Sequence, residues 1–139
     1  VELSPVSTLD VFPTLLALAG GRAPEDCSID GRDIRSYLMP NQDAEPIPFF
    51  EFYYSASDNK PSAVRLGPWK MHVRLYSQTG NNYGFKASRN SPLLFQIEHD
   101  LGERIDRSKE QEVMISSMLK KFKTFESKTE LEGSFWIVR

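Results

Sequence analysis

Three cationic residues alternate along one expected strand. Lys70, His72 and Arg74 are two residues apart, so a strand would place them on one face at intervals of about 6–7 Å. Such a row could bind a sulfate or carboxylate group through charge-assisted hydrogen bonds. A solvated outer face, whose cations discourage edge pairing, is the simpler explanation of the pattern. We nevertheless keep Lys70, His72 and Arg74 as the candidate substrate-binding residues.

A group of acidic residues follows an apolar run near position 95. It consists of Glu98, Asp100, Glu103 and Asp106. The group lacks the Asp-x-Asp-x-Asp-Gly order of a calcium-binding loop. A turn that caps a strand and starts a helix accounts for it more simply. Since no second histidine or carboxylate shares a ligand spacing with His72, the sequence predicts no metal site.

Three further groups could do chemistry, and each has a simpler explanation. Glu51 lies in an aromatic stretch, where a carboxylate could have a raised pKa or could point outward between inward aromatic rings. Asn81, Asn82 and Tyr83 could bind a sugar or could belong to a loop rich in turn-forming residues. Cys27 is the only cysteine, which excludes an intramolecular disulfide and favours an inert loop thiol. We predict no catalytic residue.

The composition indicates an ordinary globular chain. With 139 residues it can form one domain with a real core, and its 40% hydrophobic and 26% charged contents are typical of such domains. The net charge of -2 predicts no nucleic-acid partner and no attraction to an anionic membrane. No apolar run approaches the roughly 20 residues of a membrane span. Since the chain begins with Val1 in mid-pattern, we expect a fragment or a processed product.

Residues 1–40 are predicted to form a helical lead-in. Ser7 and Asp10 are spaced as a capping box, and Gly20 with Gly21 marks the end of the helix. This helix is apolar nearly all round, so we expect it to be deeply buried. A second short helix is predicted over residues 32–39, with three residues facing inward: Ile34, Tyr37 and Leu38.

Residues 41–139 are predicted to form an antiparallel sheet covered by a helix. About four strands are predicted, which are Phe49–Tyr54, Ser62–Leu66, Trp69–Tyr76 and Pro92–Ile97. Gly67 and Pro68 form the tight turn between the second and the third. A final helix is expected to begin at Ser108, with Gln111 as its capping-box partner. The fold class is therefore α+β. The predicted shared core consists of Met71, Val73, Phe95, Ile115, Leu119 and Phe122.

Three motifs, in this order, resemble the C-terminal part of a sulfatase of the arylsulfatase type. They are STLDVFPTLLALAG at residues 7–20, followed by IDGRDIRSYL, then AVRLGPWK at residues 63–70, and PLLFQIEHDLGERID at residues 92–106. The resemblance covers residues 5–128. Two departures, Leu101 in place of proline and Phe95 in place of tyrosine, affect a turn and strand packing.

The resemblance implies a division of labour between two domains. Sulfatases of this type carry their active site on a large α/β domain and have a smaller C-terminal domain with a four-stranded antiparallel sheet and a helix. Residues 1–40 would end the large domain, and residues 41–139 would form the smaller one. The family nucleophile lies in a Cys-x-Pro-x-Arg motif that Cys27 does not match. The family's calcium-binding carboxylates and amide come from upstream segments, so calcium is expected only in the full-length parent. The loops after Tyr54 and Tyr76 are expected to border its substrate cleft.

The resemblance also implies a function and partners. The parent would hydrolyse a sulfuric ester of a carbohydrate or an aryl compound, in a periplasmic, secreted or lysosomal setting. This chain would be structural or would shape substrate selection, and its partner would be the missing N-terminal catalytic domain. Because one small sheet cannot cover the helix in residues 8–19, we also expect a homo-oligomer through that segment. Two alternatives are an independent module that binds anionic sugars and the C-terminal part of a related phosphonate or phosphate ester hydrolase.

Overall fold

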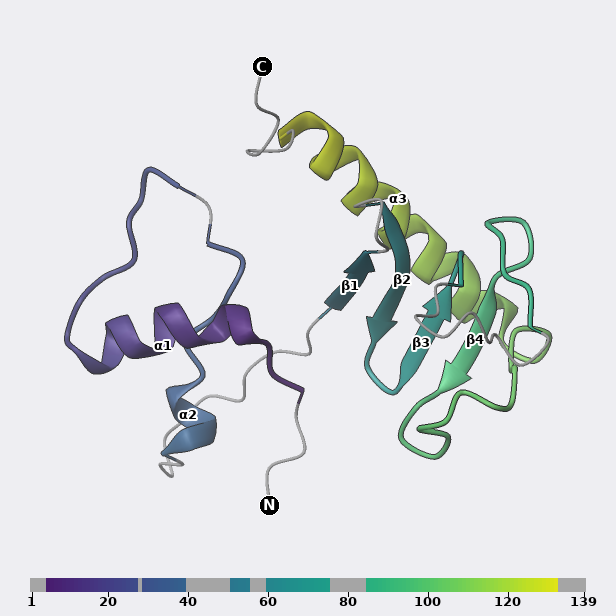
Figure 1. Cartoon of the computed structure of the whole chain (residues 1–139), viewed down its shortest axis with the longest axis horizontal. Coiled ribbons are helices and arrows are strands. Elements are labelled where there is room, and N and C mark those ends of the chain that lie inside the picture. The colour runs from purple at the N-terminus through teal and green to yellow at the C-terminus, as the bar shows by residue number, and fades with distance from the viewer. Residues whose placement is uncertain (1–4, 28, 40–50, 56–59, 76–84, 133–139) are drawn as a thin grey trace. The chain divides into compact units, whose positions relative to one another are not determined.

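The chain forms two compact units, residues 1–49 and residues 50–139 (Figure 1). The computed structural model describes residues 5–27, 29–39, 51–55, 60–75 and 85–132, with side chains up to residue 130. The boundary predicted at Pro40 falls within residues 40–50, outside the described residues. The assignment of the first unit to a large sulfatase domain stays a prediction.

The first unit begins with the predicted capped helix. A 3₁₀ turn, η1 (Thr8–Asp10), leads into α1 (Val11–Leu18). Ser7 is the N-cap and forms a reciprocal capping box with Asp10, as predicted. Gly20 follows the helix with a φ of 75°, a conformation that glycine adopts at little cost. The second helix, α2 (Arg35–Leu38), is shorter than predicted.

Two buried polar side chains of the first unit fasten residues 32–34 to the first helix. The Asp10 carboxylate accepts hydrogen bonds from the backbone N–H groups of Ser7 at 2.7 Å and of Arg32 at 2.8 Å. The Thr14 hydroxyl donates to the Asp10 carbonyl at 2.5 Å and accepts from the Ile34 N–H at 3.1 Å. Hydrogen bonds of the buried Asp10 and Thr14, rather than a large apolar core, therefore organise this unit.

The expected deep burial of the first helix is wrong for the described residues. Most of its large apolar side chains are about half exposed, including Phe12 at 56% and Leu15 at 59%. Only Pro13 and Thr14 are buried within α1. The inward orientation predicted for Leu38 is also wrong, since this side chain is 60% exposed.

The second unit contains the predicted antiparallel sheet. Its order is β1-β2-β3-β4, and every neighbouring pair is antiparallel. Gly67, with a φ of 65°, forms the tight turn between the second and third strands, because few other residues adopt this conformation without strain. The strands are β1 (Glu51–Ser55), β2 (Pro61–Leu66), β3 (Trp69–His72) and β4 (Leu93–Gln96).

The long helix α3 (Glu112–Glu132) lies across one face of this sheet (Figure 1). Together with the sheet it confirms the α+β fold. Among the described residues, no helix is long and apolar enough to cross a bilayer. The buried residues that the sheet and helix share are Val64, Met71, Val73, Leu94, Met118 and Phe122, and Ile115 and Leu119 pack against them.

One predicted core residue lies on the opposite face. The strand register pairs Lys70 with Phe95 and Met71 with Leu94, so Leu94 faces α3 and Phe95 faces away from it. Phe95 instead joins a second buried cluster with Leu93 and Ile97. Its inclusion in the shared core was therefore wrong.

The predicted start of the last helix is also wrong. The helix begins at Glu112 rather than at Ser108, because Ser108 is engaged by a neighbouring carboxylate. Asp106 accepts hydrogen bonds from the Ser108 N–H at 2.9 Å, the Ser108 hydroxyl at 2.8 Å and the Leu94 N–H at 3.0 Å. Asp106 thereby ties the approach to α3 to the last strand of the sheet.

Candidate functional site

A cluster of charged groups lies on the sheet face opposite α3. Lys70 and His72 share that face of β3, and both contact Glu103 in the loop after β4. Lys70 Nζ lies 2.5 Å from Glu103 Oε1, and His72 Nε2 lies 2.8 Å from Glu103 Oε2. His72 Nε2 makes no aligned hydrogen bond among the described residues, so its contact with Glu103 is one of charge when the ring is protonated. The ammonium group of Lys70 also lies 4.7 Å from the centre of the Tyr54 ring, within cation–π range.

The predicted row of three cations is divided. Arg74 follows the end of β3, and its guanidinium donates to the backbone carbonyl of Lys60 at 3.5 Å. The structure thus brings Lys70 and His72 together at Glu103 and gives Arg74 a different neighbour. Substrate binding by the three residues stays a prediction.

Glu103 occupies an unusual backbone position. Its φ is 51°, and no other non-glycine residue in the described part of the chain has a positive φ. This conformation costs free energy for most residues. Asp100 holds the turn, since its carboxylate accepts the N–H groups of Arg104 and Ile105, each at 2.8 Å. This arrangement confirms the prediction that the acidic group serves a turn, and it directs Glu103 toward the strand.

The charge state of Glu103 follows from its neighbours. Burial raises the pKa of this carboxyl, but the contacts with His72 and Lys70 outweigh burial and lower the pKa to about 2. Glu103 is therefore ionised at neutral pH and balances the charge of Lys70. The sequence did not reveal this role, because Glu103 and Lys70 are 33 residues apart. The available signal was the position of Glu103, which follows β4, the strand that pairs with the lysine- and histidine-bearing β3.

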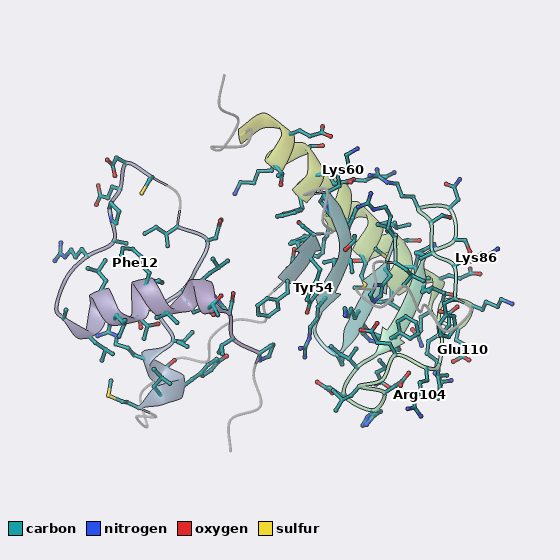
Figure 2. All side chains as sticks on the ribbon, in the orientation of Figure 1. Phe12, Tyr54, Lys60, Lys86, Arg104 and Glu110 are labelled. Carbon is teal, nitrogen blue, oxygen red and sulfur yellow. The ribbon has the colours of Figure 1, made fainter. Side chains whose placement is uncertain are left out.

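A cavity of about 410 Å³ adjoins the cluster and is lined by Phe85, Gly102, Glu103 and Arg104. Phe85 contacts Phe95 edge-on, with ring centres 5.7 Å apart. Figure 2 labels Arg104 in the loop that follows β4 and Tyr54 on β1. An aromatic wall beside cationic groups suits a ligand that has both an apolar body and an anionic group.

The described residues contain no group of three His, Cys, Asp or Glu side chains that could hold a metal ion. They therefore do not fit the calcium ion that the resemblance assigns to the parent. Cys27 is an exposed free thiol. The proposed sugar contacts at residues 81–83, and the loops at residues 56–59 and 76–84, lie outside the described residues.

Glu51 is not a carboxylate with a raised pKa. The Tyr53 hydroxyl donates to its Oε2 at 2.7 Å, and the Lys121 ammonium donates to its Oε1. Burial raises the pKa of Glu51, but these two hydrogen bonds outweigh burial and lower it. Burial, together with the hydrogen bond to Glu51, raises the pKa of Tyr53. Glu51 therefore serves as an anchor between β1 and α3, with a pKa that is lowered rather than raised.

Residues 48–131 match the family model described as the C-terminal region of aryl-sulfatase. This match covers more than half of the chain and includes the whole described sheet and nearly all of α3. The chain belongs to the sulfatase family, and it corresponds to the C-terminal region of an aryl-sulfatase.

Individual relatives and solved structures are also similar to this chain. Human steryl-sulfatase is 33% identical over 119 residues, which cover 72% of this chain and 20% of that protein. A structure solved in work on glycosaminoglycan metabolism by Bacteroides thetaiotaomicron has a TM-score of 0.61 at 17% identity, covering 85% of this chain and 24% of that one. The structure of Ps i-CgsB in complex with k-i-k-neocarrahexaose has a TM-score of 0.60 at 25% identity, and the match covers 88% of this chain and 24% of that one. The chain spans about a fifth of the length of the curated relatives it matches.

Proposed function

We propose that this chain is the C-terminal part of a protein that hydrolyses a sulfate ester of a carbohydrate or an aryl compound. The observation that carries the proposal is the family match over residues 48–131, the region that folds as a four-stranded sheet under one helix. The chain has no Cys-x-Pro-x-Arg motif, so the nucleophile and the calcium ligands would come from a catalytic domain. That domain is the proposed partner of this chain.

The role proposed for this chain is structural and substrate-shaping. Glu103 holds Lys70 and His72 against the sheet face, next to the cavity that Arg104 lines. A sulfate group that reached this face would share Lys70 with Glu103 rather than meet an uncompensated cation. We therefore expect Lys70, His72 and Arg74 to tune substrate affinity modestly and not to supply the main sulfate contacts.

Two classes of ester are supported by relatives of different kinds. Steryl-sulfatase is named for a steroid ester, which favours an aryl or sterol compound. Ps i-CgsB was solved with k-i-k-neocarrahexaose, which favours a carbohydrate. The proposal therefore covers both classes, and an assay with one representative of each separates them.

The coding sequence upstream of Val1 provides the first test. We expect it to encode a Cys-x-Pro-x-Arg or Ser-x-Pro-x-Arg motif, and the product of the whole reading frame should cleave a chromogenic aryl sulfate or a sulfated oligosaccharide. Alanine in place of the motif's cysteine or serine should abolish turnover, while this chain alone should be inactive with added calcium. A reading frame without the motif, or turnover of phosphate and phosphonate esters but not sulfate esters, would contradict the proposal.

A further inference from the structure

The loop after β4 is bonded to the sheet at both ends of residues 100–106, which we call the Glu103 turn. At its start, the Asp100 N–H donates to the Gln96 carbonyl at 2.9 Å. At its end, the Asp106 carboxylate accepts the Leu94 N–H at 3.0 Å. The contacts made by the middle of the turn therefore decide how closely it lies on the sheet face.

Glu103 supplies the contacts that attach the middle of this turn to β3. Its carboxylate lies 2.5 Å from Lys70 Nζ and 2.8 Å from His72 Nε2. Apolar packing adds little here, because Leu101 is 88% exposed and Ile105 is 53% exposed. Attraction between charges therefore holds the turn, and its position depends on the charge of the two partners.

The backbone of Glu103 favours release of the turn when these contacts weaken. Its φ of 51° is costly for a residue with a side chain, and such a conformation persists only when surrounding interactions offset the cost. Asp100 shapes the turn from inside by accepting two backbone N–H groups. It does not reach β3, so this internal bonding leaves the attachment to Glu103.

His72 is the partner whose charge changes near neutral pH. A histidine side chain ordinarily gains or loses its proton between pH 5 and 8, whereas a lysine ammonium stays charged over that range. The His72 side chain is 13% exposed, and its Nε2 has no aligned hydrogen bond in the described part of the chain. A protonated ring therefore attracts Glu103 by charge across 2.8 Å, and a neutral ring loses most of that attraction.

Glu103 is the acidic group that contacts the His72 ring in the part of the chain that the structure describes. On β4 the ring meets Phe95 edge-on, with centres 5.8 Å apart, and on β2 it is opposite Ala63. The other charged or titratable groups on the surrounding elements are Tyr54, Arg65, Lys70, Arg74 and Arg104. Four of these five are cations, so Glu103 is the group that favours the protonated ring.

We propose that protonation of His72 closes the Glu103 turn onto β3 and that deprotonation of His72 loosens it. The closed form holds the proton more tightly than the open form, because only the closed form places a carboxylate beside the ring. The closed turn is therefore favoured as the pH falls from 8 to 5. At still lower pH, Glu103, whose pKa is about 2, accepts a proton itself and the turn is released again.

The cavity of about 410 Å³ depends on the position of this turn. Three of its four lining residues, Gly102, Glu103 and Arg104, belong to the turn, and Phe85 supplies the remaining wall. Loosening the turn moves these three residues, so access to the cavity changes with pH. This inference goes beyond the proposed hydrolysis, because it concerns a motion of this chain and no step of the reaction.

Amide exchange with water, measured by NMR on the labelled chain between pH 5 and 8, tests the proposal. Protection is expressed relative to the unfolded chain at each pH. The amides of residues 103–105 should lose protection about threefold to tenfold as the pH rises from 5 to 8, while the Met71 amide in β3 keeps its protection. His72→Gln should show the lower protection at every pH, and His72→Lys, which carries a permanent charge, should show the higher one.

His99 provides the matched control, since it is the other of the two histidines and is exposed in the loop that leads into the turn. His99→Gln should leave the pH dependence unchanged. Glu103→Gln, at a residue outside the strands, should abolish it, which keeps the proposal testable if a change at His72 disturbs the sheet. Exchange of the Met71 amide reports such a disturbance in each variant.

Three results would overturn the proposal. They are equal protection of the wild-type turn at pH 5 and pH 8, a wild-type pH dependence in His72→Gln or Glu103→Gln, and loss of the pH dependence in His99→Gln. Because the readout is exchange in this chain's own loop, failure here leaves the sulfatase proposal intact, and an inactive parent leaves this proposal intact.

Discussion

Different interactions stabilise the inside of each of the two units. Residues 50–139 bury a continuous apolar core between the sheet and α3, with Met71, Leu94 and Met118 fully buried. Residues 1–49 are organised by the Asp10 and Thr14 hydrogen bonds, while most of the large apolar side chains of their helix are about half exposed. The sheet unit therefore contains its own source of stability, whereas the helical unit has apolar surface suited to a partner.

The largest expected effect separates two phenylalanines. Phe122 is 1% exposed in the sheet unit, and Phe12 is 56% exposed in the helical unit. Phe122→Ala should lower the free energy of unfolding by about 3–5 kcal/mol, because it leaves a cavity in the core. Phe12→Ala should cost less than about 1 kcal/mol. Denaturant unfolding of both variants measures the difference, with Lys123→Ala as a surface control, and similar losses for the two phenylalanines would refute the comparison.

The next effect should be confined to the helical unit. Asp10→Ala removes the acceptor of the Ser7 and Arg32 N–H groups, which should cost that unit about 1–3 kcal/mol. Hydrogen exchange should show faster exchange of the Arg32 amide and unchanged exchange of the Val64 amide in β2. Asp26→Ala, at an exposed residue, is the control. An effect on Val64 as large as that on Arg32 would mean that the two units do not unfold separately.

The sequence predicted those features that depend on local spacing. The capping box of Ser7 and Asp10, the turn at Gly67 and the shared face of Lys70 and His72 each depend on residues close together in the chain. The face of Phe95 was not predictable in this way. Residues 93–97 are apolar at nearly every position, so periodicity does not assign a face, and the register with β3 decides it.

The start of the last helix was missed for a local reason, and the other features were missed because they depend on contacts between distant residues. Ser108 has the chemistry of an N-cap, but the Asp106 carboxylate takes both its N–H and its hydroxyl. Glu103 sits in a turn, but its partners come from a strand about 30 residues earlier. The anchor between β1 and α3 joins Glu51 to Lys121, which are 70 residues apart. Such pairings follow from the fold and not from any local pattern.

The Glu103 cluster predicts an effect of intermediate size that depends on pH. The folded pKa of about 2 lies below the ordinary value of 4.5, so the folded state binds fewer protons than the unfolded state between these values. The stabilisation is complete above about pH 4.5 and is lost as the pH falls toward 2. Glu103→Gln should cost about 1–2 kcal/mol at neutral pH after allowance for solvent screening.

Unfolding free energies at several pH values test this prediction. The difference between the wild-type chain and Glu103→Gln should shrink on acidification and vanish near pH 2. Glu110→Gln changes an exposed carboxylate paired with Arg107, and it should have little effect at any pH. A difference for Glu103→Gln that stays constant from neutral to acid pH would show that Lys70 and His72 do not stabilise the ionised form.

The smallest expected effect on stability concerns the exposed apolar face of α1 in the helical unit. Phe12 and Leu15 lie three positions apart on α1, and both are more than half exposed, so replacing them with glutamate should change the unfolding free energy by only about 0.5 kcal/mol. The same change should reduce self-association, because it places charge on the apolar surface that we expect to be shared between copies. Sedimentation velocity over a range of concentrations measures this, with Leu101→Glu and Val113→Glu together as the control, since both residues are highly exposed apolar side chains of the sheet unit. A wild-type chain that stays monomeric at high concentration would contradict the prediction, and the apolar face of α1 would then need no second copy of this chain to cover it.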